Sequence, residues 1–414
     1  MPGEQRVVCV GVSLRDDGYK AELLDELARL VEAVGANPVE RILIRVQRYN
    51  PATLIGPGKL EELARIVEED EAEVVVFDEE LSPAQVRNLE EALGARVMDR
   101  TELILEIFAQ RAKSREGKLQ VELARLYYLL PRLPGKGKQL SRLGGGIGTR
   151  GPGETKLEVD RRTINRRIYA IKRKLEKVRR SREVRRRARR RLPYPQVSLV
   201  GYTNAGKSTL LNALAGSSVE VADQLFSTLD TTTRLIRLPD GGAFFLSDTV
   251  GFIRRLPHQL VEAFKATLED VREADLLLHV ADASHPEVLE QIEAVERTLY
   301  EIGAHRKPAL LVLNKADLVD DARRILRLVG ERRDAVVVSA LERRGLDELL
   351  SRIQDMLFGQ YKVYRFAIPL EDVRALELIS RRGKLLSKNY TDAEVIVEAK
   401  VDAALANELA RYVR

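Results

Sequence analysis

One stretch of the chain has the residue types and spacing of a phosphate-binding loop. The sequence Gly201-Tyr202-Thr203-Asn204-Ala205-Gly206-Lys207-Ser208 lies between an apolar run and a helical pattern. In such a loop the backbone N–H groups surround phosphate oxygens, the lysine reaches the β and γ phosphates, and the serine hydroxyl binds Mg²⁺. The motif alone fits an ATPase as well as a GTPase. We assign nucleotide binding here to Gly201, Asn204, Ala205, Gly206, Lys207, Ser208 and Thr209.

Two further segments complete the phosphate side of the site. Asp248-Thr249-Val250-Gly251 follows an apolar run, so Asp248 can hold Mg²⁺ and the Gly251 N–H can meet the γ phosphate. The segment 226–233 is the place for a switch threonine, and we choose Thr228 as a third Mg²⁺ ligand. Its neighbours Thr231–Thr233 fit a β-strand equally well.

A third pair of segments predicts guanine as the base. Asp317 of Asn314-Lys315-Ala316-Asp317 can accept two hydrogen bonds from guanine, whereas adenine has no matching donors. Asn314 would brace the loop, and Lys315 would pack its stem over the ring. Ser339-Ala340-Leu341 would supply the Ala340 N–H to guanine O6. Because all these motifs occur in the right order, we expect GTP and GDP as ligands.

The catalytic set lacks one group that many GTPases use. Phe252 follows Gly251 where a glutamine often orients the attacking water, and an apolar ring cannot do so. We therefore expect slow intrinsic hydrolysis that a partner or a cation stimulates. Asn204 could help hold K⁺ beside the phosphates; the alternative is that it only braces the loop. Catalysis is assigned to Lys207, Thr228, Gly251 and Asn204.

The elements that position these residues fall into four predicted domains, and the chain is expected to be α/β and multidomain. Residues 1–100 alternate apolar runs with helical patterns, which predicts a small α/β domain with a largely parallel sheet. Residues 193–358 predict a doubly wound P-loop GTPase domain. Residues 359–414 predict a small α+β domain whose function the sequence does not disclose.

Residues 101–192 predict an antiparallel two-helix coiled-coil hairpin with a glycine-rich tip. Apolar residues on both arms follow a 3-4 spacing with a step of seven. They are Leu105, Phe108, Ala112, Leu119, Leu123, Leu126 and Leu130, then Leu157, Ile164, Ile168, Ile171, Leu175 and Val178. The tip between Pro131 and Gly153 holds eight glycines, and its charged residues are basic. Glycine would let this backbone approach a crowded RNA surface closely, or the tip is simply mobile.

The charge of the chain is concentrated on the second arm of that hairpin. Between Arg161 and Arg191 there are 17 Arg or Lys residues and two Glu, a net charge of +15. Since the whole chain carries +6, the remaining residues sum to −9. Such a segment is typical of a polyanion-binding surface; a solvated helix face or an anionic membrane patch is the alternative. The predicted RNA contacts are Arg132, Lys136, Lys138, Arg142, Arg150, Arg185, Arg186, Arg187, Arg189 and Arg190.

Composition excludes several other classes of protein. Hydrophobic residues make up 44% and charged residues 32%, which fits a globular protein with an ionised surface. The single cysteine excludes an intramolecular disulfide framework, and the four histidines form no zinc-site spacing. No apolar stretch is long enough to span a bilayer. We expect a cytoplasmic monomer, with peripheral membrane association as the alternative.

The combined motifs resemble the HflX family of ribosome-associated GTPases. The specific signal is the glycine-rich stretch 144–153 joined to Glu154-Thr155-Lys156-Leu157-Glu158-Val159-Asp160-Arg161-Arg162, followed by the nucleotide motifs. The resemblance implies binding to the large ribosomal subunit, a hairpin that reaches toward the peptidyl-transferase region, and separation of ribosomes into subunits. It also implies faster GTP hydrolysis on ribosomes and, in some members, ATP binding by the N-terminal domain.

Two other classes of function remain open from the sequence. A GTPase of RNA modification or ribosome assembly would share the nucleotide motifs, and a membrane-linked GTPase would need an amphipathic membrane-binding helix. An RNA-binding scaffold with a regulatory nucleotide site would explain the basic hairpin but not the complete set of nucleotide elements.

Overall fold

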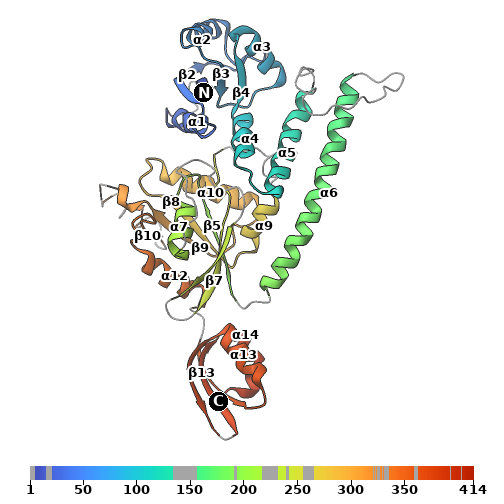
Figure 1. Cartoon of the computed structure of the whole chain (residues 1–414). Coiled ribbons are helices and arrows are strands. Elements are labelled where there is room, and N and C mark those ends of the chain that lie inside the picture. Colours follow the sequence, from blue (N-terminus) through green and yellow to red (C-terminus); the bar gives the residue numbers. More distant parts are fainter. Residues whose placement is uncertain are drawn as a thin grey trace. The chain divides into compact units, whose positions relative to one another are not determined.

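The computed structural model describes most of the chain (Figure 1). The described residues are 5–14, 21–133, 156–190, 194–216, 232–238, 242–254, 265–319, 321, 323, 327–328, 330, 335–358, 362–391, 393–401 and 403–414. The chain forms two compact units, one mainly of residues 1–178 and the other mainly of residues 179–414. Among the described residues, no helix is both long and apolar enough to cross a membrane.

The first unit begins with a parallel four-stranded sheet. Its strands are β1 (Arg6–Leu14), β2 (Asn37–Val46), β3 (Val74–Phe77) and β4 (Arg96–Asp99), in the order β2-β1-β3-β4. The crossover helices are α1 (Ala21–Ala33), α2 (Pro57–Glu69) and α3 (Pro83–Leu93). All four residues of β3 are buried, as expected for a parallel strand covered on both faces. The predicted alternation of strands and helices in this region is confirmed.

A helical middle region follows the parallel sheet. Its helices are α4 (Arg100–Arg111), α5 (Arg115–Leu129), the short 3₁₀ helix η1 (Leu130–Arg132) and α6 (Lys156–Arg190). The continuous seam predicted from Leu105 to Leu130 is wrong, because the helix breaks between α4 and α5. The Ser114 side chain caps α5 by accepting a hydrogen bond from the Gly117 N–H, so a new helix starts there.

Because of this break, α4 and α5 pack against different parts of the first unit. In α4, Phe108 is fully buried, and the Arg111 guanidinium donates to the carbonyl of Ala33 at the end of α1. α4 therefore belongs with the parallel sheet. The leucines of α5 and the isoleucines of α6 form a separate apolar cluster, made of Leu119, Leu123, Leu126, Leu133, Ile164, Ile168 and Ile171.

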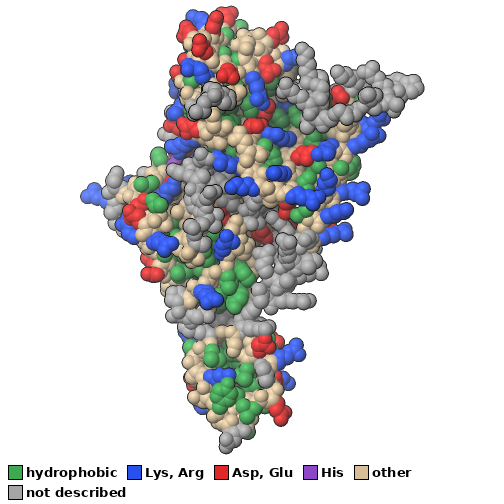
Figure 2. Space-filling model, viewed as in Figure 1, with side chains coloured by type: hydrophobic (Ala, Val, Ile, Leu, Met, Phe, Trp, Pro, Cys, Tyr) green, Lys and Arg blue, Asp and Glu red, His purple; other side chains and the backbone are tan. Residues whose placement is uncertain are grey.

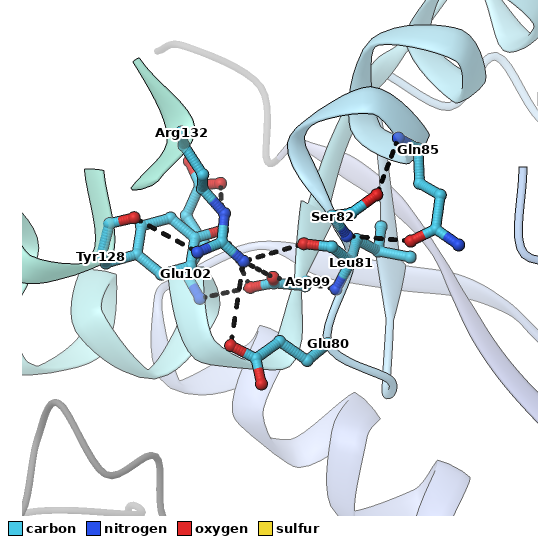
Figure 3. Close-up of polar contacts among 8 residues, drawn as sticks. All are labelled: Glu80, Leu81, Ser82, Gln85, Asp99, Glu102, Tyr128 and Arg132. Carbon is cyan, nitrogen blue, oxygen red and sulfur yellow. Dashed lines mark hydrogen bonds and ion pairs between the residues drawn. The ribbon is translucent and has the colours of Figure 1, made fainter. Parts of the chain in front are cut away.

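A buried carboxylate joins the parallel sheet to the middle region (Figure 3). Asp99 ends β4 and caps α4 through the Glu102 N–H, 2.9 Å from its Oδ1. The same oxygen accepts from the Tyr128 hydroxyl at 3.0 Å, and Oδ2 accepts from Arg132 at 3.0 Å and from the Leu81 N–H. Burial raises the pKa of Asp99, and these hydrogen bonds oppose that rise. One side chain thus fixes β4, the loop before α3, α5 and η1 together.

Arg132 is therefore placed differently from the RNA contact that the sequence suggested. Only 6% of it is exposed, its guanidinium lies 3.7 Å from the Tyr128 ring centroid, and it also donates to the Leu81 carbonyl at 2.8 Å. A guanidinium held this way is not available to phosphates. The physical reason is the charge of Asp99, which is buried and needs a cation beside it.

The second unit contains a mixed six-stranded sheet. Its strands are β5 (Gln196–Gly201), β6 (Thr232–Arg237), β7 (Ala243–Asp248), β8 (Leu276–Asp282), β9 (Ala309–Asn314) and β10 (Ala335–Val337). The order is β10-β9-β8-β5-β7-β6, with β6 antiparallel to β7 and the other pairs parallel. Its helices are α7 (Lys207–Ala215), α9 (Lys265–Glu273), α10 (Val288–Glu301) and α12 (Leu346–Phe358), with the 3₁₀ helix η3 (Ala316–Leu318).

This strand order fixes where ligands can bind. From β5 the chain moves to β7 on one side and then to β8 on the other, so the order reverses at β5. In open α/β sheets, ligands bind beyond the carboxyl ends of the strands at such a reversal. Thr232 and Thr233 lie in β6, which agrees with the alternative that the threonine run is partly a strand.

The last part of the chain is a small antiparallel sheet with two short helices. It contains β11 (Lys362–Pro369), β12 (Lys384–Tyr390) and β13 (Glu394–Val401) in the order β11-β13-β12. The helices are α13 (Val373–Arg382) and α14 (Ala403–Glu408), followed by the 3₁₀ helix η4 (Ala410–Tyr412). Phe366, Ile379 and Val397 are fully buried between the sheet and these helices. An antiparallel sheet with helices beside it agrees with the predicted α+β class.

Candidate guanine-nucleotide site

The phosphate-binding loop requires glycine at two positions. Gly201 has φ of +153°, and a Cβ there would lie 2.1 Å from the Val280 carbonyl oxygen of β8. Gly206 has φ of +88°, and a Cβ there would lie 2.2 Å from Nδ2 of Asn314. Neither neighbour can move without breaking the sheet or the adjacent loop. The loop backbone is therefore pressed between β8 and Asn314, and α7 begins directly after it.

Asn314 holds the loops of the site together. Its Nδ2 donates to the Ala205 carbonyl at 2.9 Å, and its Oδ1 accepts from the Ala340 N–H at 3.0 Å. This N–H is the group that the sequence assigns to guanine O6. The side chain is 2% exposed and lies at the end of β9. One amide thus connects the phosphate-binding loop to the loop after β10.

Lys207 is the buried cation of the site. Its Nζ donates to the carbonyls of Gly201 at 3.1 Å and Tyr202 at 2.6 Å. Burial lowers the pKa of Lys207 from 10.5 to about 8, and the charge of Asp248 opposes this shift. A Cβ at Gly251 would lie 3.1 Å from Lys207 Nζ, so Gly251 brings backbone close to the ammonium group. Phosphate oxygens would give that ammonium a stronger partner than two carbonyls do.

Ser208 and Asp248 form the predicted metal-binding pair. The Ser208 hydroxyl donates to Asp248 Oδ2 at 2.6 Å, although the two residues lie on α7 and β7. A hydroxyl and a carboxylate side by side are the hard oxygen ligands that Mg²⁺ prefers. Thr249, which follows Asp248, donates to the Leu199 carbonyl at 2.6 Å and fixes the end of β7 against β5. The donor set therefore fits Mg²⁺.

The base-reading loop is shaped by contacts that the sequence did not reveal. Lys315 has φ of +60°, and its Nζ lies 2.8 Å from Asp282 Oδ2. Asp282 Oδ1 accepts hydrogen bonds from the N–H and the hydroxyl of Ser284. An aspartate that ends an apolar run and lies two residues before a serine is a recognisable turn signal. Asp282 thus holds the Lys315 ammonium group at the end of β8.

Asp317 has a carboxylate oxygen that the described residues leave without a donor. Its Oδ1 atom is buried, and within the described part of the chain it has no hydrogen-bond partner. A buried carboxylate oxygen without a donor is costly unless a ligand supplies one. The N1–H and N2–H₂ groups of guanine are such donors. Ser339 accepts from the Glu342 N–H through its hydroxyl, while Leu341 is 77% exposed beside it.

Phe252 lies in the core and extends the sheet. Its N–H donates to the Gly201 carbonyl at 3.0 Å, and its carbonyl accepts from the Thr203 N–H at 2.8 Å. The next turn is held by the Tyr202 hydroxyl, which accepts from the Arg254 N–H at 2.9 Å. The Phe252 ring is 2% exposed. The structure therefore puts an apolar, buried group where a water-orienting glutamine often stands.

Several predicted residues cannot be compared with the structure. Thr228 and the tip residues Lys136, Lys138, Arg142 and Arg150 lie outside the described residues. The backbone of Arg185, Arg186, Arg187, Arg189 and Arg190 lies in α6, but their side chains are outside the description. Asn204 is exposed in the loop with φ of +62°. Thr209 lies in the first turn of α7.

Comparison with known proteins decides the family. Residues 21–109, 111–189 and 196–315 match families described as GTP-binding GTPase N-terminal, GTP-binding GTPase middle region and 50S ribosome-binding GTPase. The GTPase HflX of Caldanaerobacter subterraneus subsp. tengcongensis is 49% identical over 392 residues, or 95% of this chain and 90% of the relative. The chain belongs to the HflX family of GTPases.

Another HflX member is similar over nearly the same length. The GTPase HflX of Escherichia coli strain K12 is 48% identical over 373 residues, or 90% of this chain and 87% of the relative. A GTP-binding protein of the archaeon Sulfolobus solfataricus, solved in complex with GDP, is 28% identical. That match covers 85% of this chain and 98% of the archaeal chain, with a TM-score of 0.45. As a member of the HflX family, the chain is a GTPase.

We predict that Asp317 controls base selection in this HflX GTPase. Asp317→Asn should weaken GDP binding on the order of 100-fold and improve xanthosine diphosphate binding, because the amide reverses part of the hydrogen-bond pattern. Titration calorimetry with both nucleotides measures the two changes. The matched control is Asp321→Asn, an exposed carboxylate shortly after η3, which should leave both affinities unchanged. An Asp317→Asn variant that keeps its GDP affinity would contradict the assignment.

We also predict that nucleotide affinity falls with rising pH. The pKa of Lys207 is about 8 in the free site, and bound phosphates stabilise the charged form and raise it. Below pH 8 the ammonium is already charged, whereas above pH 8 binding must take up a proton. GTP affinity should therefore be constant from pH 7 to 8 and then fall by up to about tenfold per pH unit. Lys207→Met should bind weakly without this decline, and a flat wild-type profile to pH 9 would refute the prediction.

Proposed function

We propose that this HflX-family GTPase binds the large ribosomal subunit through its basic helical middle region and uses GTP hydrolysis to promote separation of ribosomal subunits. The observation that carries the proposal is the arrangement of α6. Its isoleucines are buried against α5, and every basic residue from Arg161 to Arg180 whose side chain the structure describes is exposed. Blue Lys and Arg side chains accordingly stand along α6 in Figure 2.

The size of this charge favours RNA over a solvated face. The segment from Arg161 to Arg191 carries a net charge of +15, whereas the rest of the chain carries −9. The positive charge is therefore concentrated in this segment and is not spread over the whole protein. The description of the family that matches residues 196–315, a 50S ribosome-binding GTPase, supports the large subunit as the source of that RNA. We infer that α5 and α6 run antiparallel as a hairpin and that residues 134–155 join them at the RNA-facing tip.

The nucleotide site would act as the switch. Ser208 and Asp248 would hold Mg²⁺, with Thr228 as the third protein ligand, and the bound ion neutralises charge on the phosphates. Lys207 would exchange the carbonyls of Gly201 and Tyr202 for phosphate oxygens. The Gly251 N–H would donate to the γ phosphate. Because Gly251 lies beside Lys207, loss of the γ phosphate would remove a hydrogen-bond partner from the segment that follows β7.

Hydrolysis needs a further group, because Phe252 is buried and apolar. We propose that a K⁺ ion beside Asn204 stabilises the charge that develops between the β and γ phosphates, as an arginine does in other GTPases. The Asn204 side chain is exposed at the loop, so its amide oxygen is available to a cation at this position. The large subunit would supply further stimulation.

The first prediction from this proposal concerns the cation. GTP hydrolysis should be faster in K⁺ than in Na⁺ at equal ionic strength, on the order of tenfold or more. Asn204→Gly should abolish the difference, since glycine accepts the loop's positive φ of +62° but has no side-chain oxygen. Phosphate release with saturating GTP is the measurement. Equal rates in the two salts would show that Asn204 only braces the loop.

The second prediction concerns the basic helix. Changing Arg185, Arg186, Arg187, Arg189 and Arg190 to Gln should weaken binding to purified large subunits. It should also flatten the plot of log affinity against log salt by roughly 0.7 to 0.9 for each phosphate that is no longer neutralised. Nucleotide affinity should not change, because these residues precede β5. Arg297→Gln with Arg306→Gln, on the exposed surface of the second unit, is the control and should leave the slope unchanged.

Shortening of the glycine-rich stretch 144–153 should separate binding from function. Loss of the segment should reduce subunit separation and ribosome-stimulated hydrolysis more than it reduces binding, because the basic helix remains. Pelleting across a salt series and a subunit-separation assay measure the two effects. An arginine variant with an unaltered salt slope would mean that α6 is only a solvated helix.

A further inference from the structure

A stripe of basic residues with one tyrosine runs along α6 opposite its apolar seam. The seam residues Ile164, Ile168 and Ile171 are buried against α5. On a helix of 3.6 residues per turn, the positions farthest from this seam follow a spacing of three and four. All of them are exposed, and they are Arg162, Arg166, Tyr169, Arg173, Lys177 and Arg180.

Tyr169 makes no contribution to the core of its unit. Its exposed fraction is 71%, whereas Tyr128 of α5 is 2% exposed and takes part in the Asp99 cluster. An aromatic ring that stands in solvent on a straight helix offers a whole face to a ligand. Aromatic side chains used in this way are typical stacking platforms for nucleic-acid bases.

The two arginines nearest to Tyr169 along the stripe, Arg166 and Arg173, are not neutralised by an acidic residue in the described part of the chain. Arg167, on the side toward α5, lies 2.6 Å from Glu122 and is neutralised by it. Neither Arg166 nor Arg173, by contrast, has an ion-pair partner within the described part of the chain. These residues lie three before and four after the tyrosine, one helical turn to each side. The ring is therefore flanked by two guanidinium groups that a polyanion could bind.

We propose that Tyr169, Arg166 and Arg173 form a binding site for an unpaired RNA base with its neighbouring phosphates. The base would stack on the Tyr169 ring, and the two guanidinium groups would contact the phosphates on either side of it. Bases inside a duplex are already stacked, so the site selects single-stranded or looped RNA. The site rests on the proposed function and adds to it the kind of RNA that the basic helix recognises.

The test compares ring and charge at the same site in the full chain. The probes are a single-stranded RNA of twelve adenylates and an RNA duplex of twelve pairs, with binding measured by fluorescence anisotropy over a salt series. Tyr169→Ala should weaken single-strand binding about tenfold without a change in salt slope, since no charge is removed. Tyr169→Phe should restore it. Tyr300→Ala removes a tyrosine that is 69% exposed in the second unit and should have no effect.

A second variant, which removes the two charges, distinguishes base stacking from electrostatic attraction to the phosphates. Arg166→Gln with Arg173→Gln should flatten the salt slope by roughly 1.4, for two phosphates of a single strand. If Tyr169→Ala bound both RNAs like the wild type while the arginine variant showed a flatter slope, the surface would be electrostatic only and the base site would be refuted. If Tyr169→Ala weakened duplex binding equally, selection of unpaired bases would be refuted. Failure of the wild type to bind large subunits would overturn the proposed function instead.

Discussion

The Asn314 side chain is the contact on which the nucleotide site depends. Its amide joins the Ala205 carbonyl, 109 residues earlier in the chain, to the Ala340 N–H, 26 residues later. Gly206 has no side chain because Asn314 Nδ2 occupies that space. The loop that binds phosphates and the loop that reads the base therefore share one rigid support. Each of these two loops satisfies one polar group of the same buried amide.

The same principle of a buried polar group with several partners organises the first unit. Asp99 ends a strand, caps a helix and receives hydrogen bonds from Tyr128 and Arg132. A buried carboxylate tolerates this position only because every donor around it is directed inward. Through these bonds α5 and η1 are fixed to the parallel sheet as far as Arg132. The apolar face of α6 packs against that fixed α5 through its isoleucines.

Much of the architecture can be predicted because its signals are local. Strands β5, β7, β9 and β10 are apolar runs, and the motifs that begin at Gly201, Asp248, Asn314 and Ser339 lie at or just after their ends, so motif and element support each other. The break between α4 and α5 is hidden in the sequence because the single step of seven residues, from Ala112 to Leu119, keeps the phase of the 3-4 spacing across it. Its signal is Ser114, a helix-capping residue within the apolar pattern. The sequence predicts Arg132 as an RNA contact because the segment around it is basic and glycine-rich. Its burial instead results from the ion pair with Asp99, a contact that only the folded chain reveals.

We propose that the bound nucleotide controls attachment of this GTPase to the large ribosomal subunit. The most direct measurement is co-sedimentation of the full chain with purified large or small subunits, in the presence of a non-hydrolysable GTP analogue or of GDP. We expect the GTP-analogue form to pellet with large subunits at low salt, to pellet far less with small subunits, and to be largely released when GDP replaces the analogue. Equal pelleting in both nucleotide states, or no pelleting with large subunits at any salt concentration, would contradict it.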